Sequence, residues 1–375
     1  FVNVEQVHLG KDVFLTPYYL GKDLGCKVRI IYPMKDSNMG LPKMHRGVRL
    51  IPISWKGKPI KNRYLRQLMI LLYIIRYMVP SKYGMLFHYY RMDTVYYGLI
   101  YKLLNPFGKL YLKLDADITA IKAEDDYRNI IEYRFKDFCH WLFSKAVDCV
   151  SCETTIARDF ILNSKATCYK FRENMILMPN GFDEEELINA GIKVKTFDEK
   201  ENIFITVGRI GTYQKNNEML LEALKGMDLK DWKFYIIGSI EDAFIPKIER
   251  FYTERPDLKE KVVFTGNISS KKELWEYYNR SKVFVLTSRF ESFALVLYEA
   301  ARFDNFIVTT KVGTIEDLID IGYGGIVIEN GNVYSLSNTL CRIIDGSCIT
   351  SKKTLCPDNL SWAKIVEYIA GKLKQ

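Results

Sequence analysis

Twelve short apolar runs rich in β-branched residues recur along this 375-residue chain, and each is followed by turn-forming residues and a segment of helical period. The runs are continuously apolar, which is typical of strands buried on both faces in parallel sheets. Their alternation with helical segments indicates βαβ units. Six runs fall in each half: 27–32, 47–53, 84–89, 109–114, 148–152 and 175–178, then 202–207, 233–237, 262–265, 283–286, 306–310 and 325–328.

The length of the chain predicts two domains, because a single hydrophobic core seldom serves so many residues. A polar stretch over 184–201 separates the two sets of runs. We therefore predict an α/β fold of two Rossmann-like domains facing across a cleft, with an N-terminal domain over 1–190 and a C-terminal domain over 191–360. Residues 361–375 are predicted to form a final helix with Ser361 as its N-cap. In such sheets ligands bind beyond the carboxyl ends of the strands.

The net charge of +9 is unevenly distributed, since residues 1–100 hold 16 Lys and Arg against 5 Asp and Glu. This excess favours an anionic partner such as lipid headgroups, phosphates or nucleic acid, and a well-solvated basic face is the alternative. Residues 62–79 fit an amphipathic helix flanked by Arg63, Arg66 and Arg76. That helix either docks on an anionic membrane surface or covers the first sheet with its basic ends in water.

The eight cysteines form no spaced framework, and Cys149 and Cys152 lie in a run that reads as a buried strand. We interpret them as core residues, and unpaired thiols favour a reducing, cytoplasmic compartment. The longest apolar run, 68–75, is too short to span a bilayer. We expect a cytoplasmic protein and leave open peripheral attachment to the inner face of the cell membrane.

The stretch 286–300 carries the most specific chemistry. A strand is expected to end at Ser288, a loop to carry Glu291, and a helix to start near Ser292, where free backbone N–H groups can receive a phosphate. Glu299 follows Glu291 by eight residues. On one helix that spacing places both carboxylates on roughly the same face, where they can bracket the hydroxyl groups of a sugar and a ribose.

This stretch resembles the E-x7-E signature of GT-B glycosyltransferases of family 4 (glycosyl transferases group 1), with Glu291 and Glu299 in the two acidic positions. The resemblance is strong over 175–330 and weaker before it, and Ser361-Trp362 resembles the start of the GT-B helix that crosses back to the first domain. It implies a retaining enzyme of the hexosyltransferase type. Such an enzyme moves a sugar from a UDP- or GDP-linked nucleotide sugar to a hydroxyl acceptor.

The resemblance also implies roles for individual residues. Arg209 and Lys215 would grip the diphosphate and Glu291 would face the sugar, which makes these three the expected catalytic residues. Cations stabilise the negative charge that accumulates on a departing diphosphate. No metal or other cofactor is implied. The expected contacts to the nucleotide sugar are Gly208, Gly238, Asn267, Ser292, Phe293, Ala294, Leu295 and Glu299.

The acceptor side is less defined, because the histidine that many family members carry after the strand 109–114 is absent here. Asp115-Ala116-Asp117 also matches the D-x-D that holds a divalent metal in GT-A enzymes, so metal-dependent transfer is an alternative. The candidates on the acceptor side are His8, His88, Asp115 and Asp117.

The expected acceptor is a saccharide or lipid-linked saccharide in bacterial polysaccharide or glycolipid biosynthesis. A dinucleotide oxidoreductase would need a G-x-G-x-x-G fingerprint that the sequence lacks. A non-enzymatic, basic nucleic-acid-binding protein is a second alternative. Since the sequence has no RRM, KH or helix-turn-helix signature, we expect no nucleic-acid partner.

Overall fold

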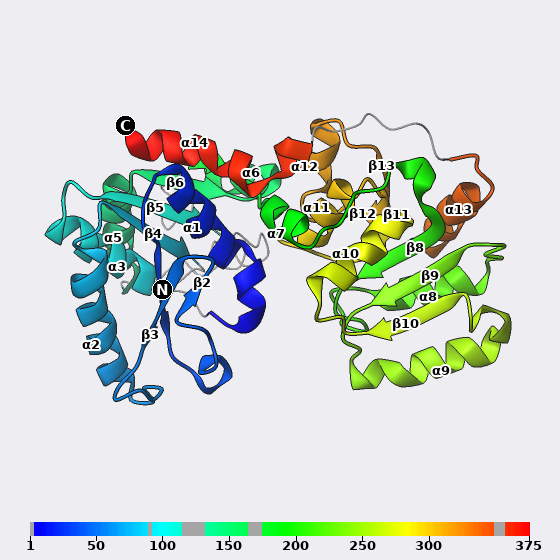
Figure 1. Cartoon of the computed structure of the whole chain (residues 1–375), viewed down its shortest axis with the longest axis horizontal. Helices are drawn as coiled ribbons and strands as arrows, with labels where there is room; N and C mark the ends of the chain where they lie inside the picture. The colour runs from blue at the N-terminus through cyan, green and yellow to red at the C-terminus, as the bar shows by residue number, and fades with distance from the viewer. Residues whose placement is uncertain (1–3, 89–91, 115–131, 164–174, 349–356) are drawn as a thin grey trace. The chain divides into compact units, whose positions relative to one another are not determined.

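The computed structural model describes residues 4–88, 92–114, 132–163, 175–348 and 357–375. The chain divides into two compact units (Figure 1), Phe1–Asp183 with Ser361–Gln375 and Glu184–Leu360. The short helix α7 (Glu184–Asn189) therefore belongs to unit 2, whereas the sequence placed the boundary after residue 190. An ion pair ties α7 to its unit, because Arg302 Nη2 donates to Glu184 Oε2 at 2.8 Å.

Unit 2 is built on a six-stranded, all-parallel sheet with the order β10-β9-β8-β11-β12-β13. The chain runs outward from β8 through β9 to β10 and then returns to place β11 on the other side of β8. This reversal creates a topological switch point at the carboxyl ends of β8 and β11, where such sheets bind ligands. The strands are β8 (Glu201–Val207), β9 (Lys233–Ile237), β10 (Val262–Gly266), β11 (Ser281–Leu286), β12 (Phe306–Thr310) and β13 (Gly325–Ile328). The longer helices are α8 (Asn217–Lys225), α9 (Ile245–Glu254), α10 (Lys271–Arg280), α11 (Leu295–Arg302), α12 (Ile315–Asp320) and α13 (Val333–Ile344).

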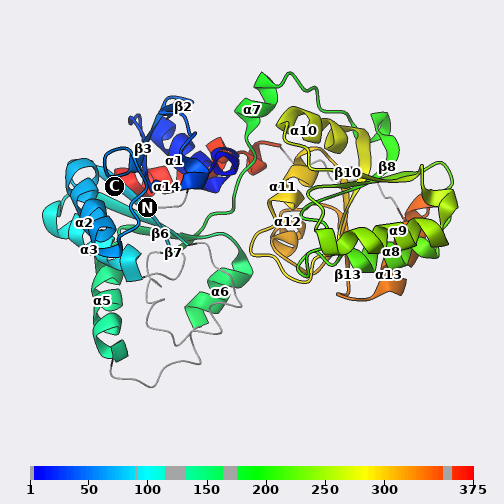
Figure 2. The same ribbon diagram turned by 90° about the horizontal axis from the view of Figure 1, so that it is seen from below.

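Unit 1 contains two sheets, one of order β1-β3-β2 and a parallel one of order β4-β5-β6-β7. The strands are β1 (Arg29–Pro33), β2 (Met44–His45), β3 (Val48–Ile53), β4 (Tyr83–His88), β5 (Lys109–Leu114), β6 (Cys149–Cys152) and β7 (Met175–Leu177). The helices are α1 (Asp12–Asp23), α2 (Arg63–Tyr73), which continues into a π turn (Ile74–Met78), α3 (Met92–Leu104), α5 (Glu132–Ala146), α6 (Thr155–Asn163) and α14 (Trp362–Lys374) (Figure 2).

The last helix, α14, returns to unit 1 and packs against α1, as predicted. Its N-cap is Ser361, whose hydroxyl accepts from Lys364 N at 3.2 Å. Trp362 is almost fully buried and lies so close to Gly181 that a Cβ there would come within 2.6 Å of the Trp362 nitrogen. Glycine at 181 therefore allows the returning helix to start against the end of the first unit's chain.

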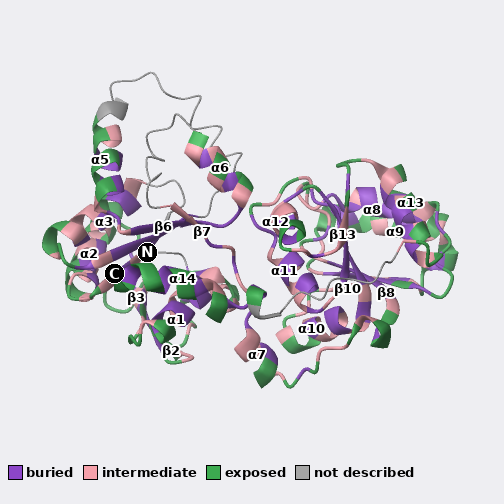
Figure 3. Cartoon of the chain, turned by 90° about the horizontal axis from the view of Figure 1, so that it is seen from above, coloured by how far each residue is buried: buried purple, intermediate pink, exposed green. Residues whose placement is uncertain are grey.

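The predicted α/β class with parallel sheets is confirmed, and every one of the twelve predicted runs contains a strand. Central strands such as β6 and β12 are buried along their whole length, and the helices are mixed in exposure (Figure 3). Cys149 and Cys152 are buried in β6, which confirms their interpretation as core residues. Burial raises the pKa of each thiol to about 12, so both stay protonated near neutral pH.

Candidate functional site

The switch point of unit 2 brings Lys215 and Glu291 into contact. Lys215 follows β8 and Glu291 follows β11, and Lys215 Nζ lies 2.5 Å from Glu291 Oε1. Ser288 Oγ donates to the same carboxylate oxygen at 2.6 Å, and Gln214 Nε2 donates to Oε2 at 3.0 Å. The Lys215 and Glu291 side chains are only 13% and 9% exposed. Two loops far apart in sequence thus converge on one carboxylate.

Arg209 joins this cluster through an amide bridge. Its Nη2 donates to Gln214 Oε1 at 3.0 Å, while Nε2 of the same amide group donates to Glu291 Oε2. The two loops are also tied through their backbones, because Arg289 N donates to Gln214 O at 2.7 Å. Arg209 itself is exposed, so its charge faces solvent beside the Lys215–Glu291 pair. Gln214 lies at the centre of the cluster, although we did not predict it as a site residue.

Glycines allow the loops after β8, β9 and β10 to meet. Gly238 has φ of +142°, and a Cβ there would lie 1.7 Å from the Gly208 carbonyl oxygen. Gly238 N also donates to Gly266 O at 2.9 Å. Asn267 follows Gly266 in the sequence, and it lines a shallow, polar cavity of about 570 Å³ with Ser270 and other residues. Gly208, Gly238 and Asn267 therefore lie at the carboxyl ends of three neighbouring strands.

The helix α11 begins at Leu295 and not near Ser292, so that prediction is wrong. Ala294 is the N-cap of the helix and has a left-handed backbone, with φ of 65°. The helix therefore cannot extend beyond Ala294 toward the N-terminus. Ser292 and Phe293 consequently lie in the preceding loop, where Phe293 O accepts from Thr314 N at 3.0 Å. Glu291 is therefore outside the helix, and the argument that both glutamates share one helical face fails. The first N–H groups of α11 still lack helical acceptors of their own.

Glu299, the fifth residue of α11, is held by α10. Tyr278 OH donates to Glu299 Oε2 at 3.1 Å, and Trp275 Nε1 lies 3.5 Å from Oε1. Burial raises the pKa of Tyr278 well above its ordinary value, and the nearby carboxylate adds to the rise. The phenol therefore remains a hydrogen-bond donor that fixes the carboxylate.

Unit 1 holds a wide pocket of about 1150 Å³ next to the predicted acceptor-side residue His8. His8 Nδ1 accepts from Glu5 N at 2.9 Å. Burial, with Lys11 adding to the effect, lowers the pKa of His8, which favours the neutral imidazole. The pocket is lined by charged side chains of both signs, among them Lys35, Lys61, Arg66, Asp36 and Asp93.

A buried charge cluster reaches this pocket through Asp12. Lys113 in β5 is completely buried and pairs with Glu153, and its Nζ lies 3.5 Å from Asp12 Oδ2. Burial alone would lower the pKa of Lys113, but the carboxylates of Glu153 and Asp12 raise it above its ordinary range. Asn180 Nδ2 donates to Glu153 Oε1 at 3.0 Å. The sequence signal for this cluster is a lysine near the end of a continuously apolar run.

The other acceptor-side predictions are not described in full. His88 ends β4, but its side chain lies outside the described residues, as do Asp115 and Asp117. Among the residues that the structure describes, no three His, Cys, Asp or Glu side chains gather closely enough to hold a metal ion. None of the described helices has the length and apolar character needed to cross a membrane.

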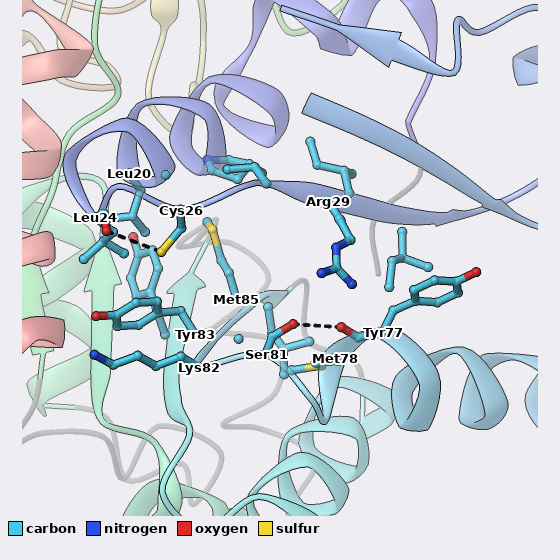
Figure 4. Close-up of a pocket in the computed structure, with 18 of the residues that line it drawn as sticks. Leu20, Leu24, Cys26, Arg29, Tyr77, Met78, Ser81, Lys82, Tyr83 and Met85 are labelled. Carbon is cyan, nitrogen blue, oxygen red and sulfur yellow. Dashed lines mark hydrogen bonds between the residues drawn. The ribbon is translucent and has the colours of Figure 1, made fainter. Parts of the chain in front are cut away.

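A second cavity of unit 1, about 420 Å³, separates the edges of β1 and β4 (Figure 4). Arg29 of β1 lies on one side, Tyr83 and Met85 of β4 lie on the other, and Leu20 of α1 covers the space. Within the described chain neither edge has a further strand partner. Open edges of this kind are places where sheets add strands. The cavity contains none of the predicted site residues.

Comparison with known proteins finds similar sequences. Residues 189–355 match the family described as Glycosyl transferases group 1. The amylovoran biosynthesis glycosyltransferase AmsD of Erwinia amylovora is 33% identical over 131 residues, 34% of this chain and 35% of AmsD. The Escherichia coli UDP-Gal:alpha-D-GlcNAc-diphosphoundecaprenol alpha-1,3-galactosyltransferase is 26% identical over 194 residues, 49% of each chain. The alignments thus span about half or less of the length of these two curated relatives.

The fold is shared more widely than the sequence. The solved structure of Anabaena Alr3699/HepE in complex with UDP and glucose superposes with a TM-score of 0.64 at 16% identity, covering 99% of this chain and 98% of HepE. The predicted GT-B fold is therefore confirmed.

Proposed function

We propose that this protein is a retaining glycosyltransferase of the hexosyltransferase type and family 4, which moves a sugar from a nucleoside-diphosphate sugar to a hydroxyl acceptor. The observation that carries the proposal is the Lys215–Glu291 pair at the switch point of unit 2, bridged to Arg209 by Gln214. Cations and a carboxylate side by side suit a ligand that joins a diphosphate to a hydroxyl-rich sugar. The Glycosyl transferases group 1 match over this unit supports the same chemistry.

Lys215 and Arg209 are the proposed electrostatic catalysts. When the bond between the anomeric carbon and the diphosphate oxygen breaks, the electron pair leaves with the diphosphate. Fixed cations stabilise that developing charge, and a cation already held by Glu291 and the loops needs little reorganisation. The free N–H groups at the start of α11, near Ala294 and Leu295, can add hydrogen bonds to a phosphate.

Retention requires the acceptor oxygen to bond to the anomeric carbon on the face from which the diphosphate leaves. In the proposed reaction the acceptor hydroxyl gives its proton to the departing phosphate oxygen, so no nucleophile from the protein is needed. Glu291 then acts on the sugar by accepting hydrogen bonds from its hydroxyl groups. Its partners Ser288 and Gln214 keep the carboxylate oriented beside Lys215.

The nucleotide is proposed to lie along the carboxyl ends of β8, β9 and β10. Glu299, oriented by Tyr278, would accept hydrogen bonds from the ribose hydroxyls, and Asn267 would meet the base edge. Ser292 and Phe293 would contact the phosphates, and Gly208 and Gly238 leave room for a close backbone approach. We propose UDP as the nucleotide, and HepE, whose solved structures contain UDP and UDP-glucose, supports this choice.

The acceptor is proposed to be a saccharide, free or lipid-linked, bound near His8 in the wide pocket of unit 1. The named function of the E. coli relative, which acts on a diphosphoundecaprenol-linked sugar, supports a lipid-linked acceptor in polysaccharide or glycolipid biosynthesis. The name of AmsD points to polysaccharide biosynthesis as well. Such an acceptor would place the enzyme in the cytoplasm, at the inner face of the membrane.

A thermal-shift screen against UDP, GDP, ADP, CMP and NAD, with and without EDTA, tests this proposal. Stabilisation by one nucleoside diphosphate that persists in EDTA is the expected result. Stabilisation that needs a divalent metal would favour the alternative that uses Asp115 and Asp117. A response to NAD alone would contradict the proposed transferase activity.

A further inference from the structure

Three helices of unit 1 form one layer over the β4–β7 sheet. The helix α3 packs against α5 and against the π turn that ends α2 (Figure 2). All three send side chains into one buried cluster, including Ile70 and Ile74 from the α2 segment, Tyr97 and Tyr101 from α3, and Phe143 from α5. Since their inner faces meet in this core, their outer faces together form the outside of the layer.

The outer face of α2 is a stripe of apolar side chains. Tyr64, Leu68, Leu72 and Ile75 are spaced by four, four and three residues, which places them on one side of the helix. They are 83%, 52%, 47% and 45% exposed. Isolated exposed apolar residues are common, but a continuous row on one helix marks an interaction surface.

Exposed apolar side chains continue onto the other two helices of the layer. Leu103 at the end of α3 and Phe107 just after it are 81% and 91% exposed. Phe138 and Trp141 of α5 stack on each other with ring centroids 5.9 Å apart, and both are exposed. We name the exposed side chains of α2, α3 and α5 the outer apolar face.

The charged residues of the α2 segment are all cations. Residues 37–92 contain eleven Lys and Arg and no Asp or Glu. Arg63, Arg66 and Arg76 of the α2 segment are exposed and form no ion pair within the described part of the chain. The acidic residues of the layer are Asp93 of α3 and Glu132 and Asp137 of α5, so none belongs to α2. Arg63 and Arg76 therefore place an exposed cation at each end of the α2 segment, while Arg66 lies on the opposite side of the helix.

We propose that the outer apolar face docks on an anionic lipid bilayer, with α2 lying in the plane of the interface. An aliphatic and aromatic stripe bordered by arginines is the pattern of a helix that inserts its apolar face among lipid headgroups. Arginines near an anionic surface each add attraction, and aromatic rings favour the boundary between headgroups and chains. The Leu and Ile side chains distinguish this face from a nucleic-acid-binding surface, which uses cations with stacking aromatics.

The opposite side of α2 explains why docking would matter. Arg66, Gln67 and Ile70 line the wide pocket that also contains His8. One helix thus connects the proposed acceptor pocket with the proposed membrane surface. This step rests on the proposed function: a lipid-linked acceptor with its chain in the bilayer would present its saccharide beside this pocket.

Co-sedimentation with vesicles tests the docking itself. The full chain is mixed with vesicles of phosphatidylcholine alone or with 30% phosphatidylglycerol, a proportion chosen as roughly that of an anionic bilayer surface. Binding is expected only with the anionic lipid and should weaken as salt rises. Replacing Leu68 and Leu72 by Ser removes two half-exposed leucines, which should weaken binding about 25-fold, about fivefold for each. Replacing Arg63 and Arg76 by Gln should have a similar effect.

The matched control is Ile188→Ser with Tyr334→Ser, two apolar residues of unit 2 that are 74% and 79% exposed. These changes should leave vesicle binding intact. Stabilisation by UDP is measured on every variant, so that a folding defect is recognised. If the unaltered chain binds UDP but ignores anionic vesicles, or if the Leu68/Leu72 variant binds them as well as the control does, the docking proposal is wrong. If vesicles bind and no nucleotide does, docking stands and the proposed function fails.

Discussion

Replacing Lys215 by Met is the perturbation that most directly probes the proposed chemistry. Methionine keeps the length of the side chain and removes the cation beside Glu291, while Ser288 and Gln214 still hold that carboxylate. The loops should therefore stay in place, and the loss should appear in the reaction more than in folding. Lys215 O also accepts from Thr287 Oγ1 at 3.1 Å, a backbone contact that the substitution preserves.

The expected size of the effect follows from the position of the cation. A preorganised group that stabilises the departing charge contributes about 10²–10³ in rate, or about 3–4 kcal/mol. Lys215 is only 13% exposed, so solvent can replace little of its charge. We expect turnover of the nucleotide sugar to fall about 10²–10³-fold. The free energy of unfolding should change by about 1–2 kcal/mol at most, because the remaining carboxylate keeps two hydrogen bonds.

The assay is release of nucleoside diphosphate from the nucleotide sugar, with or without acceptor, together with a denaturation curve for each variant. Lys225→Met is the matched control, because Lys225 lies on α8 and pairs with Glu222 at 2.8 Å and Glu254 at 2.7 Å. It should lose little activity. If Lys215→Met retains turnover within threefold of the unaltered chain, the electrostatic role is refuted.

Three further predictions concern single residues. Glu299→Gln should weaken UDP binding about tenfold in calorimetric titrations, the loss of one charged hydrogen bond, and an unchanged Kd would remove the ribose assignment. Gly238→Ala should unfold the protein or lower its melting temperature by many degrees in circular dichroism, because its Cβ would lie 1.7 Å from Gly208 O; a normal melting curve would contradict the close approach. Burial lowers the pKa of His140 to about 4, so the folded protein favours the neutral imidazole. The free energy of unfolding should therefore decrease as the pH falls from about 6.5 toward 4, by up to about 3 kcal/mol. His140→Gln should remove that part of the pH dependence in urea titrations, and an identical pH profile for both proteins would show the pKa to be unshifted.

The strands of the two parallel sheets could be predicted because their apolar pattern lies within short segments of the sequence. Continuous apolar runs such as 202–207 and 306–310 fit only strands covered on both faces, and both are strands in the parallel sheet of unit 2. The two-residue strand β2, Met44–His45, escaped prediction because its antiparallel pairing with β3 leaves no periodic pattern. The start of α11 was misplaced because no local pattern marks the left-handed residue Ala294, which lies close to Gly313 in the fold.

The site was predictable in its residues and not in its geometry. Resemblance singled out Lys215 and Glu291, but their direct ion pair and the bridge through Gln214 arise from two loops that only the sheet order brings together. The buried pairing of Lys113 with Glu153 across β5 and β6 is likewise a tertiary feature. The spacing of residues in the sequence cannot predict which side chains of two strands come into contact when a helix connects those strands.

A crystal structure of this chain with UDP is the measurement that tests the central claim most directly. The account predicts the diphosphate at the carboxyl ends of β8 and β11, with an oxygen within hydrogen-bond distance of Lys215 Nζ and the ribose hydroxyls on Glu299. A diphosphate bound elsewhere, or held by a metal ion at Asp115 and Asp117 with Lys215 still paired only to Glu291, would contradict it.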